Sequence, residues 1–331
     1  MARIESNYFF EEQIPFSFQL NWQKSNFYDK KSLNRYGFSD FGISFLYHNY
    51  YDAELGKNYG LYGFMEFYLL KPKHNLKLSF RLSQGITYNT NPYNKYSNPK
   101  NKFFGTHLLF PIDAFFYLRY PKIIDNWGLQ IGLGIFHYSN GNLSSPNYGS
   151  NIPSFNFGIN YDFRKNELIT TKEMQKFDKY FHYYALMRFG INESDYIGSG
   201  RFPFYIPAFQ IERALSYRNK INLGIELFLS YFLKEQIAYE ADAEPELNVS
   251  KNTDFKRIGI YAEHEFCYDK FGINLGVGYY IYYPYHFETR FYNRLGIKYH
   301  ISDKLAFAYS LKVHGINRAE AMEWGIYYKL F

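Results

Sequence analysis

The sequence predicts an all-β protein, a transmembrane antiparallel up-and-down β-barrel of about fourteen strands, with twelve and sixteen strands as alternatives. Apolar and polar residues alternate with period two in almost every segment after residue 40, and aromatic residues make up 23% of the chain. A barrel strand turns one face to lipid and the other to the interior, which produces this alternation, and rings are abundant at the polar borders of membranes. Mean hydropathy is negative, and no apolar run approaches the ~18 residues that a spanning helix requires.

The alternation is clearest in residues 76–83, 221–230 and 271–279. A soluble β-sandwich or propeller is the alternative architecture, because half-buried sheets alternate in the same way. The number of rings on the apolar faces favours the membrane barrel. The expected strands cover residues 41–50, 59–70, 74–87, 103–120, 127–139, 152–163, 179–191, 204–217, 220–232, 254–268, 270–283, 288–300, 304–316 and 319–331.

The connections between these strands support an even strand number. Long polar connections such as 88–102, 140–151 and 233–253 alternate with tight turns such as 71–73 and 218–219. In outer-membrane barrels the short turns lie in the periplasm and the long loops lie outside. Both chain termini are therefore expected on the periplasmic side.

Two domains follow from this pattern. Residues 41–331 are expected to form the barrel, and residues 1–40 a periplasmic extension, a partial plug or an extra strand through Phe16, Phe18 and Leu20. The first twenty residues lack the basic-then-apolar pattern of a secretion signal. A barrel in the outer membrane of a Gram-negative bacterium needs such a signal, so we expect that it has been removed or replaced in this chain.

Composition argues against several classes of function. The formal net charge is +6, and the basic residues are scattered, so the basic stripe of a nucleic-acid-binding protein is missing. Cys267 is the lone cysteine, which excludes an internal disulfide. We find no metal-ligand spacing, phosphate-binding glycine loop or nucleophile elbow, and therefore expect no cofactor and no metal. Oligomeric state is not predicted.

One motif contains residue types that are used in catalysis. An apolar face runs along residues 127–135, and His137 and Ser139 continue it with the same period of two. Asn151 has the same parity as the apolar residues of the next strand, among them Phe155. Residues on one face of neighbouring strands lie within contact distance. We therefore predict that His137, Ser139 and Asn151 meet on the barrel exterior.

These residue types suit ester hydrolysis. A serine hydroxyl becomes nucleophilic when an imidazole takes its proton, and a third group improves the imidazole by orienting it. The Asn151 carbonyl is expected to accept the ring N–H of His137, although it brings no negative charge. Asn140 and Gly141 are expected to supply N–H donors to the developing oxyanion.

The run His137-Tyr138-Ser139-Asn140, followed by Pro146-Asn147 and a strand, resembles the signature of the lipid A 3-O-deacylase (PagL-type) family. The resemblance covers residues 127–163 and implies an outer-membrane barrel that hydrolyses an ester-linked acyl chain of lipid A or a related outer-leaflet lipid. It implies that His137 is the base and Ser139 the nucleophile. Family members orient the histidine with a glutamate, whose place Asn151 takes here.

The well-studied members of that family are smaller, eight-stranded barrels. The remaining length of this chain is similar to larger outer-membrane barrels of the Bacteroidetes group that are labelled acyloxyacyl hydrolases. Residues 319–325, Ala-Glu-Ala-Met-Glu-Trp-Gly, carry that second resemblance.

Two other functions remain as alternatives. A non-catalytic pore or transporter for small or hydrophobic solutes is suggested by charges on interior-facing positions, which either pair with one another or line an aqueous path. A barrel that has lost activity is favoured if Asn151 lies out of reach of His137.

We also expect His314 and Glu323 to pair across the last two strands. The interior charges are Glu66, Arg81, Asp113, Arg119, Arg188, Glu212, Glu226, Glu263, Glu265, Arg290, Arg294 and Lys298.

Overall fold

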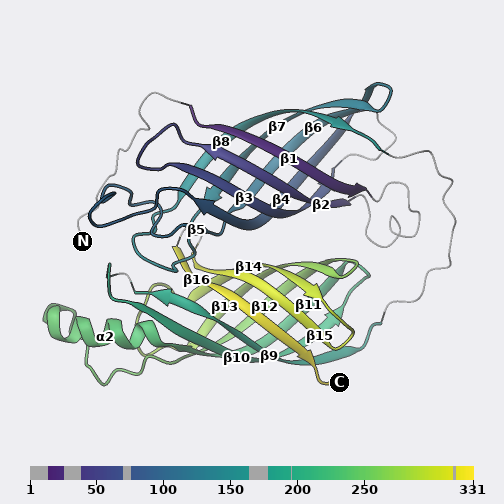
Figure 1. Cartoon of the computed structure of the whole chain (residues 1–331). Coiled ribbons are helices and arrows are strands. Elements are labelled where there is room, and N and C mark those ends of the chain that lie inside the picture. Colours follow the sequence, from purple (N-terminus) through teal and green to yellow (C-terminus); the bar gives the residue numbers. More distant parts are fainter. Residues whose placement is uncertain (1–13, 26–38, 70–75, 164–177, 195, 316–317) are drawn as a thin grey trace. The chain divides into compact units, whose positions relative to one another are not determined.

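The computed structural model describes residues 14–25, 39–69, 76–163, 178–194, 196–315 and 318–331. Strands dominate these residues, and successive strands pair antiparallel in chain order (Figure 1). The chain divides into two compact units. The first carries β1 to β8, and the second carries β9 to β16 together with the short segment 141–145.

The first unit is one antiparallel sheet. Its long strands pair in the order β1-β2-β3-β4-β6-β7-β8, and the two-residue β5 pairs with β4. The strands are β1 (Phe16–Ser25), β2 (Ser39–Asn49), β3 (Lys57–Tyr68), β4 (Lys77–Asn89), β5 (Leu108–Leu109), β6 (Ile112–Ile124), β7 (Trp127–Tyr138) and β8 (Ser150–Tyr161).

The second unit is a closed eight-stranded barrel. Neighbouring strands pair in chain order, and β16 pairs with β9 to close the ring. The strands are β9 (Phe181–Glu193), β10 (Arg201–Ala214), β11 (Asn219–Ser230), β12 (Arg257–Tyr268), β13 (Phe271–Tyr282), β14 (Phe291–His300), β15 (Leu305–His314) and β16 (Arg318–Lys329).

The predicted all-β antiparallel class is confirmed, and each of the fourteen expected segments contains a strand. β1, which runs through Phe16, Phe18 and Leu20, and the short β5 are additional, so the strand count differs from fourteen. The strands also lie in two units, where the sequence analysis places one barrel over residues 41–331. Alternation assigns the two faces of a strand, but it does not say where a sheet closes.

One expected strand begins late. Residues 103–111 contain only the two-residue β5 before β6 begins, where the alternation predicts strand from residue 103. The side-chain oxygen of Asn101 accepts the backbone N–H groups of Phe103 and Phe104, both at 3.1 Å. Such a local turn competes with strand pairing. Pro111 has no N–H to donate, which also favours a strand that starts after it.

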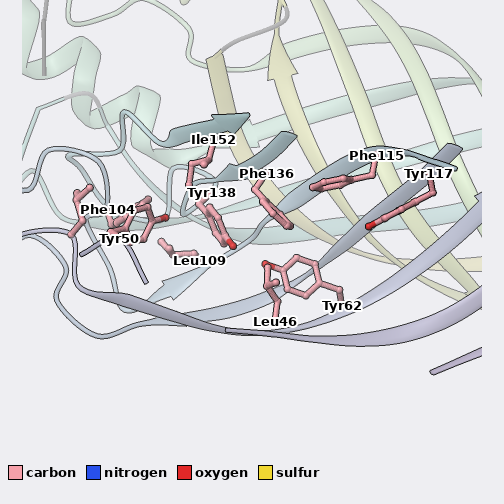
Figure 2. Packing of buried hydrophobic residues seen from close by; sticks show 11 residues of the cluster. Leu46, Tyr50, Tyr62, Phe104, Leu109, Phe115, Tyr117, Phe136, Tyr138 and Ile152 are labelled. Atoms are coloured by element: carbon pink, nitrogen blue, oxygen red, sulfur yellow. The ribbon is translucent and has the colours of Figure 1, made fainter. Parts of the chain in front are cut away.

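The interior of the first unit is packed with rings. The inward residues of the strands form one apolar cluster with residues of the connecting loops (Figure 2). Phe136 and Tyr138 of β7 point into this cluster, so His137, which lies between them in sequence, points outward. The cluster contains Leu46, Tyr50, Leu55, Tyr62, Phe104, Leu109, Phe115, Tyr117, Phe136, Tyr138 and Ile152.

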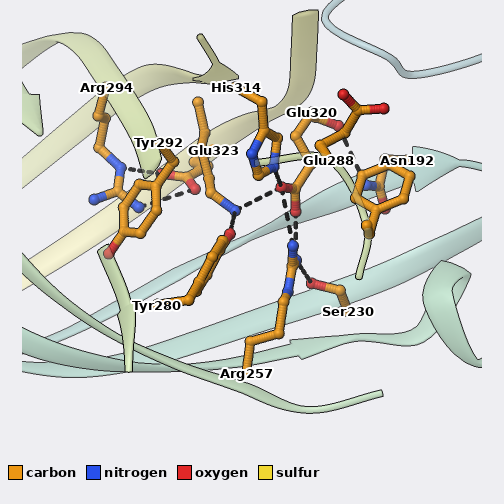
Figure 3. Close-up of polar contacts among 12 residues, drawn as sticks. Asn192, Ser230, Arg257, Tyr280, Glu288, Tyr292, Arg294, His314, Glu320 and Glu323 are labelled. Atoms are coloured by element: carbon orange, nitrogen blue, oxygen red, sulfur yellow. Dashed lines mark hydrogen bonds and ion pairs between the residues drawn. The ribbon is translucent and has the colours of Figure 1, made fainter. Parts of the chain in front are cut away.

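Ion pairs fill the interior of the barrel. The carboxylate of Glu320 contacts Arg257 at 2.5 Å, Lys312 at 2.7 Å and His314 at 2.5 Å (Figure 3). The interior charges predicted from the sequence are buried with one exception. Arg290 is exposed in the connection between β13 and β14, outside the strand that was expected to carry it.

A helix lies in the connection between β11 and β12, which was expected to be a long polar connection over residues 233–253. α2 (Tyr231–Ala243) is followed by the short 3-10 helix η1 (Pro245–Leu247). Phe232, Leu233 and Ile237 of α2 form an apolar cluster with aromatic residues of the connection between β13 and β14. Neither helix in the described part of the chain is long and apolar enough to cross a membrane.

Candidate active site

The predicted catalytic histidine lies near the end of β7 on its outward face. Leu133 and Ile135 of that face are 64% and 39% exposed, whereas Phe136 and Tyr138 are buried. His137 continues the outward parity and is half-buried. Its ring therefore lies at the end of an apolar stripe, as the alternation predicts.

Asn151 of β8 lies directly opposite His137 in the strand register. Nδ1 of His137 and Oδ1 of Asn151 are 2.8 Å apart. An amide oxygen only accepts, so the Nδ1–H of His137 is the donor. This arrangement leaves Nε2 with its lone pair, which is the tautomer that a general base needs. The predicted pairing of these two residues is present.

Ser139 follows the last residue of β7. Its backbone carbonyl accepts the N–H of Phe110 at 2.7 Å, which continues the pairing of β6 with β7 beyond the ends of the named strands. Its side chain is buried, unlike the exposed Asn151. The candidate site thus extends from an exposed amide at Asn151 to a buried hydroxyl at Ser139.

Gly149 packs against both members of the expected nucleophile and base pair. A Cβ atom at this position would lie 3.3 Å from Cβ of Ser139 and 3.4 Å from Cε1 of His137. The backbone of Gly149 has φ +67°, which L side chains rarely adopt, and its N–H donates to the carbonyl of Phe103. Sequence reasoning did not single out Gly149, although a glycine directly before a strand is a signal for such a conformation.

Asn140 is buried, and Asn147 holds its backbone. The N–H of Asn140 donates to Oδ1 of Asn147 at 2.8 Å. Gly141 has φ +61°, and a Cβ there would lie 2.2 Å from Cγ of Met322. The structure therefore gives the Asn140 N–H a protein partner, and Asn147, quoted only as part of the motif, positions the candidate oxyanion residue.

A buried carboxylate holds the segment that follows Gly141. Glu193, at the end of β9, accepts the hydroxyl of Ser144 and the N–H of Ser145, both at 2.7 Å. The same carboxylate accepts the N–H groups of Gly198 and Gly200 at 3.0 and 3.3 Å. Charge-assisted bonds of this kind are among the stronger ones in proteins. Sequence reasoning missed Glu193, because its partners are distant in the chain.

The expected pair of His314 and Glu323 does not form. His314 contacts Glu320 instead, and Glu323 pairs with Arg294 at 2.7 Å (Figure 3). The register of β15 with β16 places Glu323 opposite Ser310, whereas His314 lies opposite Arg318. The prediction for this pair was wrong, because the period of two assigns the faces of a strand but not its register with the neighbouring strand.

Comparisons with known families cover most of the chain. A family model described as lipid A 3-O-deacylase (PagL) matches residues 16–160. A second model, described as acyloxyacyl hydrolase, C-terminal domain, matches residues 180–331. The two matches correspond to the two units of the structure.

Solved structures give only distant likenesses. A mutant of the Rhodopseudomonas blastica porin is 7% identical, with 96% of this chain and 91% of the porin covered and a TM-score of 0.19. A chain from a structure titled "Asymmetric conductivity of engineered proteins" is 5% identical, with 88% of this chain and 91% of that chain covered and a TM-score of 0.18. No curated protein matches the sequence.

Proposed function

The chain belongs to the lipid A 3-O-deacylase (PagL) family, and from this premise we propose that it hydrolyses an ester-linked acyl chain of lipid A or a related outer-leaflet lipid. Ser139 is the proposed nucleophile, His137 the general base and Asn151 the residue that orients it. The hydrogen bond between His137 and Asn151, which lie directly opposite each other on neighbouring strands, is the observation that carries the proposal.

The proposed reaction has two steps. Nε2 of His137 takes the proton of the Ser139 hydroxyl as the oxygen attacks the ester carbonyl, and then gives that proton to the departing alkoxide of the sugar. Water, deprotonated by the same nitrogen, hydrolyses the acyl-serine and releases the fatty acid. The backbone N–H of Gly141 and the side-chain amide of Asn140 are proposed to stabilise the oxyanion in both steps, because the backbone N–H of Asn140 is bonded to Asn147.

The outward surface supports a site that acts from within the outer membrane. Phe155, Phe157 and Ile159 follow Asn151 along the outward face of β8 and are about two-thirds exposed, at 67%, 66% and 67%. A continuous exposed apolar surface of this kind fits contact with hydrocarbon. A lipid ester at the border of that surface would lie beside the proposed nucleophile.

The interiors of the two units do not favour the alternative of a pore or transporter. Rings pack the inward face of the first unit, and ion pairs such as that of Arg188 with Glu226 fill the barrel. The alternative of a barrel that has lost activity depended on Asn151 lying out of reach of His137. The 2.8 Å separation of the two side chains favours the hydrolase.

The proposal is tested with Ser139→Ala. Lipid A from cells that express the wild-type protein should lack one ester-linked acyl chain in mass spectra, and the variant should lower that conversion roughly a thousandfold or more. Ser154→Ala is the matched control, since the hydroxyl of Ser154 donates to the carbonyl of Ile152 on its own strand. Identical acylation patterns for wild type and Ser139→Ala would contradict the proposal.

A further inference from the structure

A row of outward-facing residues crosses four strands and includes the proposed base. The register pairs Gln84 of β4 with Ile112 of β6, Ile112 with His137 of β7, and His137 with Asn151 of β8. Directly opposed residues of an antiparallel sheet share one face. Gln84 therefore lies on the same face as His137, two strands away, at a distance of about 10 Å between backbones.

Gln84 differs from the other outward residues at this end of β4. Ile86 and Tyr88 are 44% and 53% exposed, whereas Gln84 is 5% exposed and polar. In the described part of the chain, neither Oε1 nor Nε2 of Gln84 has a hydrogen-bond partner. A buried amide without partners is unfavourable, and more so at a surface that faces hydrocarbon. The side chain thus has a donor group and an acceptor oxygen for which the described residues provide no hydrogen-bond partner.

The neighbour of Gln84 on the other side leaves space. Gly63 of β3 lies opposite Gln84 in the register. Among the residues that the structure describes, a Cβ atom at Gly63 would meet no other atom within 4 Å. There is therefore space over Gly63 into which the covered carboxamide of Gln84 can turn, and the proposed catalytic residues lie two strands further along the row.

We propose that Gln84 is a substrate-binding residue, whose carboxamide bonds a group of the lipid's acylated sugar that both donates and accepts hydrogen bonds. This inference rests on the proposed function and adds to it a polar subsite on β4. An amide or a hydroxyl next to the scissile ester has the required chemistry. A neutral carboxamide avoids the cost of placing a charge at the hydrocarbon border. The ester then lies toward His137 and Ser139.

The test uses Gln84→Met in the full chain, purified in detergent micelles. Methionine keeps the length of the side chain and removes both polar groups. The probes are synthetic glucosamine lipids with one ester-linked acyl chain beside an N-linked acyl amide: the parent lipid, its N-methylated amide, and the lipid with its neighbouring hydroxyl methylated. Wild type is expected to hydrolyse the parent with a kcat/KM about tenfold above that for one of the methylated lipids, which identifies the group bound.

Gln84→Met is expected to lower kcat/KM for the parent lipid ten- to a hundredfold, mainly through KM, and to lose the preference between the probes. Equal kcat/KM and unchanged preference in the variant would overturn the inference. Gln210→Met is the matched control, because Gln210 is a buried glutamine of β10 whose Nε2 also lacks a partner in the described residues. Its kinetics should match wild type. If Gln84→Met does not fold, Gln84→Glu, which keeps the shape and loses the donor, carries the same expectation.

A binding measurement separates this inference from the proposed function. The parent lipid is titrated into Ser139→Ala and into the double variant Ser139→Ala with Gln84→Met, and the second is expected to bind roughly tenfold more weakly. If wild type hydrolyses no probe but the double variant binds more weakly, the proposed function fails and the subsite stands. Hydrolysis by wild type with equal binding by both variants would remove the subsite and leave the proposed function intact.

Discussion

At the scale of single residues, the site is notable for an uncharged group beside the proposed base. The Asn151 side chain fixes the tautomer of His137, because its oxygen only accepts. It brings no charge to stabilise the imidazolium that forms during attack. In serine triads one carboxylate both orients the histidine and stabilises its positive charge. Here Asn151 supplies the orientation alone.

Replacing Asn151 tests this separation. Asn151→Asp is expected to raise kcat, since a carboxylate at 2.8 Å would stabilise the imidazolium. The added charge favours the protonated ring, so the acid limb of the pH–rate profile should move to higher pH. Asn151→Ala should lower kcat about tenfold through loss of the orienting bond. A slower Asn151→Asp enzyme with an unmoved acid limb would argue against His137 as the base.

Gly149 provides a second prediction at this scale. Gly149→Ala adds a Cβ at 2.9 Å from the backbone oxygen of Tyr138, 3.3 Å from Cβ of Ser139 and 3.4 Å from Cε1 of His137, and is expected to lower kcat roughly ten- to a hundredfold by displacing this segment. Gly315→Ala is the control, because Gly315 also has positive φ, at +59°, and a Cβ there meets none of the described residues within 4 Å. Both variants carry the backbone penalty, so a similar loss of activity in both would show that crowding is not the cause.

At the scale of elements, the positions of the strands can be predicted from the sequence, whereas the structure of the connections between them cannot. The expected strand over 127–139 is observed as β7, because the alternation there is uninterrupted. α2 was missed for a physical reason. Gln236 and Glu240 lie one and two turns after Phe232, and all three are buried, so the buried stripe of the helix is partly polar and its apolar periodicity is weak.

The polar stripe of α2 bonds to a tyrosine of another connection. Nε2 of Gln236 donates to the hydroxyl of Tyr285 at 3.1 Å, and that hydroxyl donates to Glu240 at 2.7 Å. Burial, followed by the bond to Glu240, raises the pKa of Tyr285, so the phenol keeps the proton that it donates. The helix is therefore positioned by contacts that no local pattern in residues 231–243 reveals.

At the scale of the whole molecule, the barrel depends on charges that are buried together. Arg257 and Lys312 share the carboxylate of Glu320, and all three side chains are almost fully buried. Removing one partner of such a group leaves a buried charge uncompensated, which costs more than the pair itself contributes. The interior of the second unit is thus sensitive to single neutral substitutions.

Glu320→Gln is expected to lower the free energy of unfolding by about 3–5 kcal/mol, measured by denaturant titration in detergent. Glu288→Gln is the control, since Glu288 pairs with the partly exposed Arg318 and should contribute less than about 1 kcal/mol. Equal stability of the two variants would mean that the buried cations find other partners.

The sequence by itself determined where most of the strands lie and which of their residues face outward, and it predicted that His137 and Asn151 lie on one face of neighbouring strands, because the period of two is a local property of each strand. The tertiary structure decided where the sheets end and close, which carboxylate His314 contacts, that Gly149 lies beside His137, and that Gln84 shares the face of His137. These features depend on the register between strands and on loops distant in the chain, and neither leaves a mark in the local alternation.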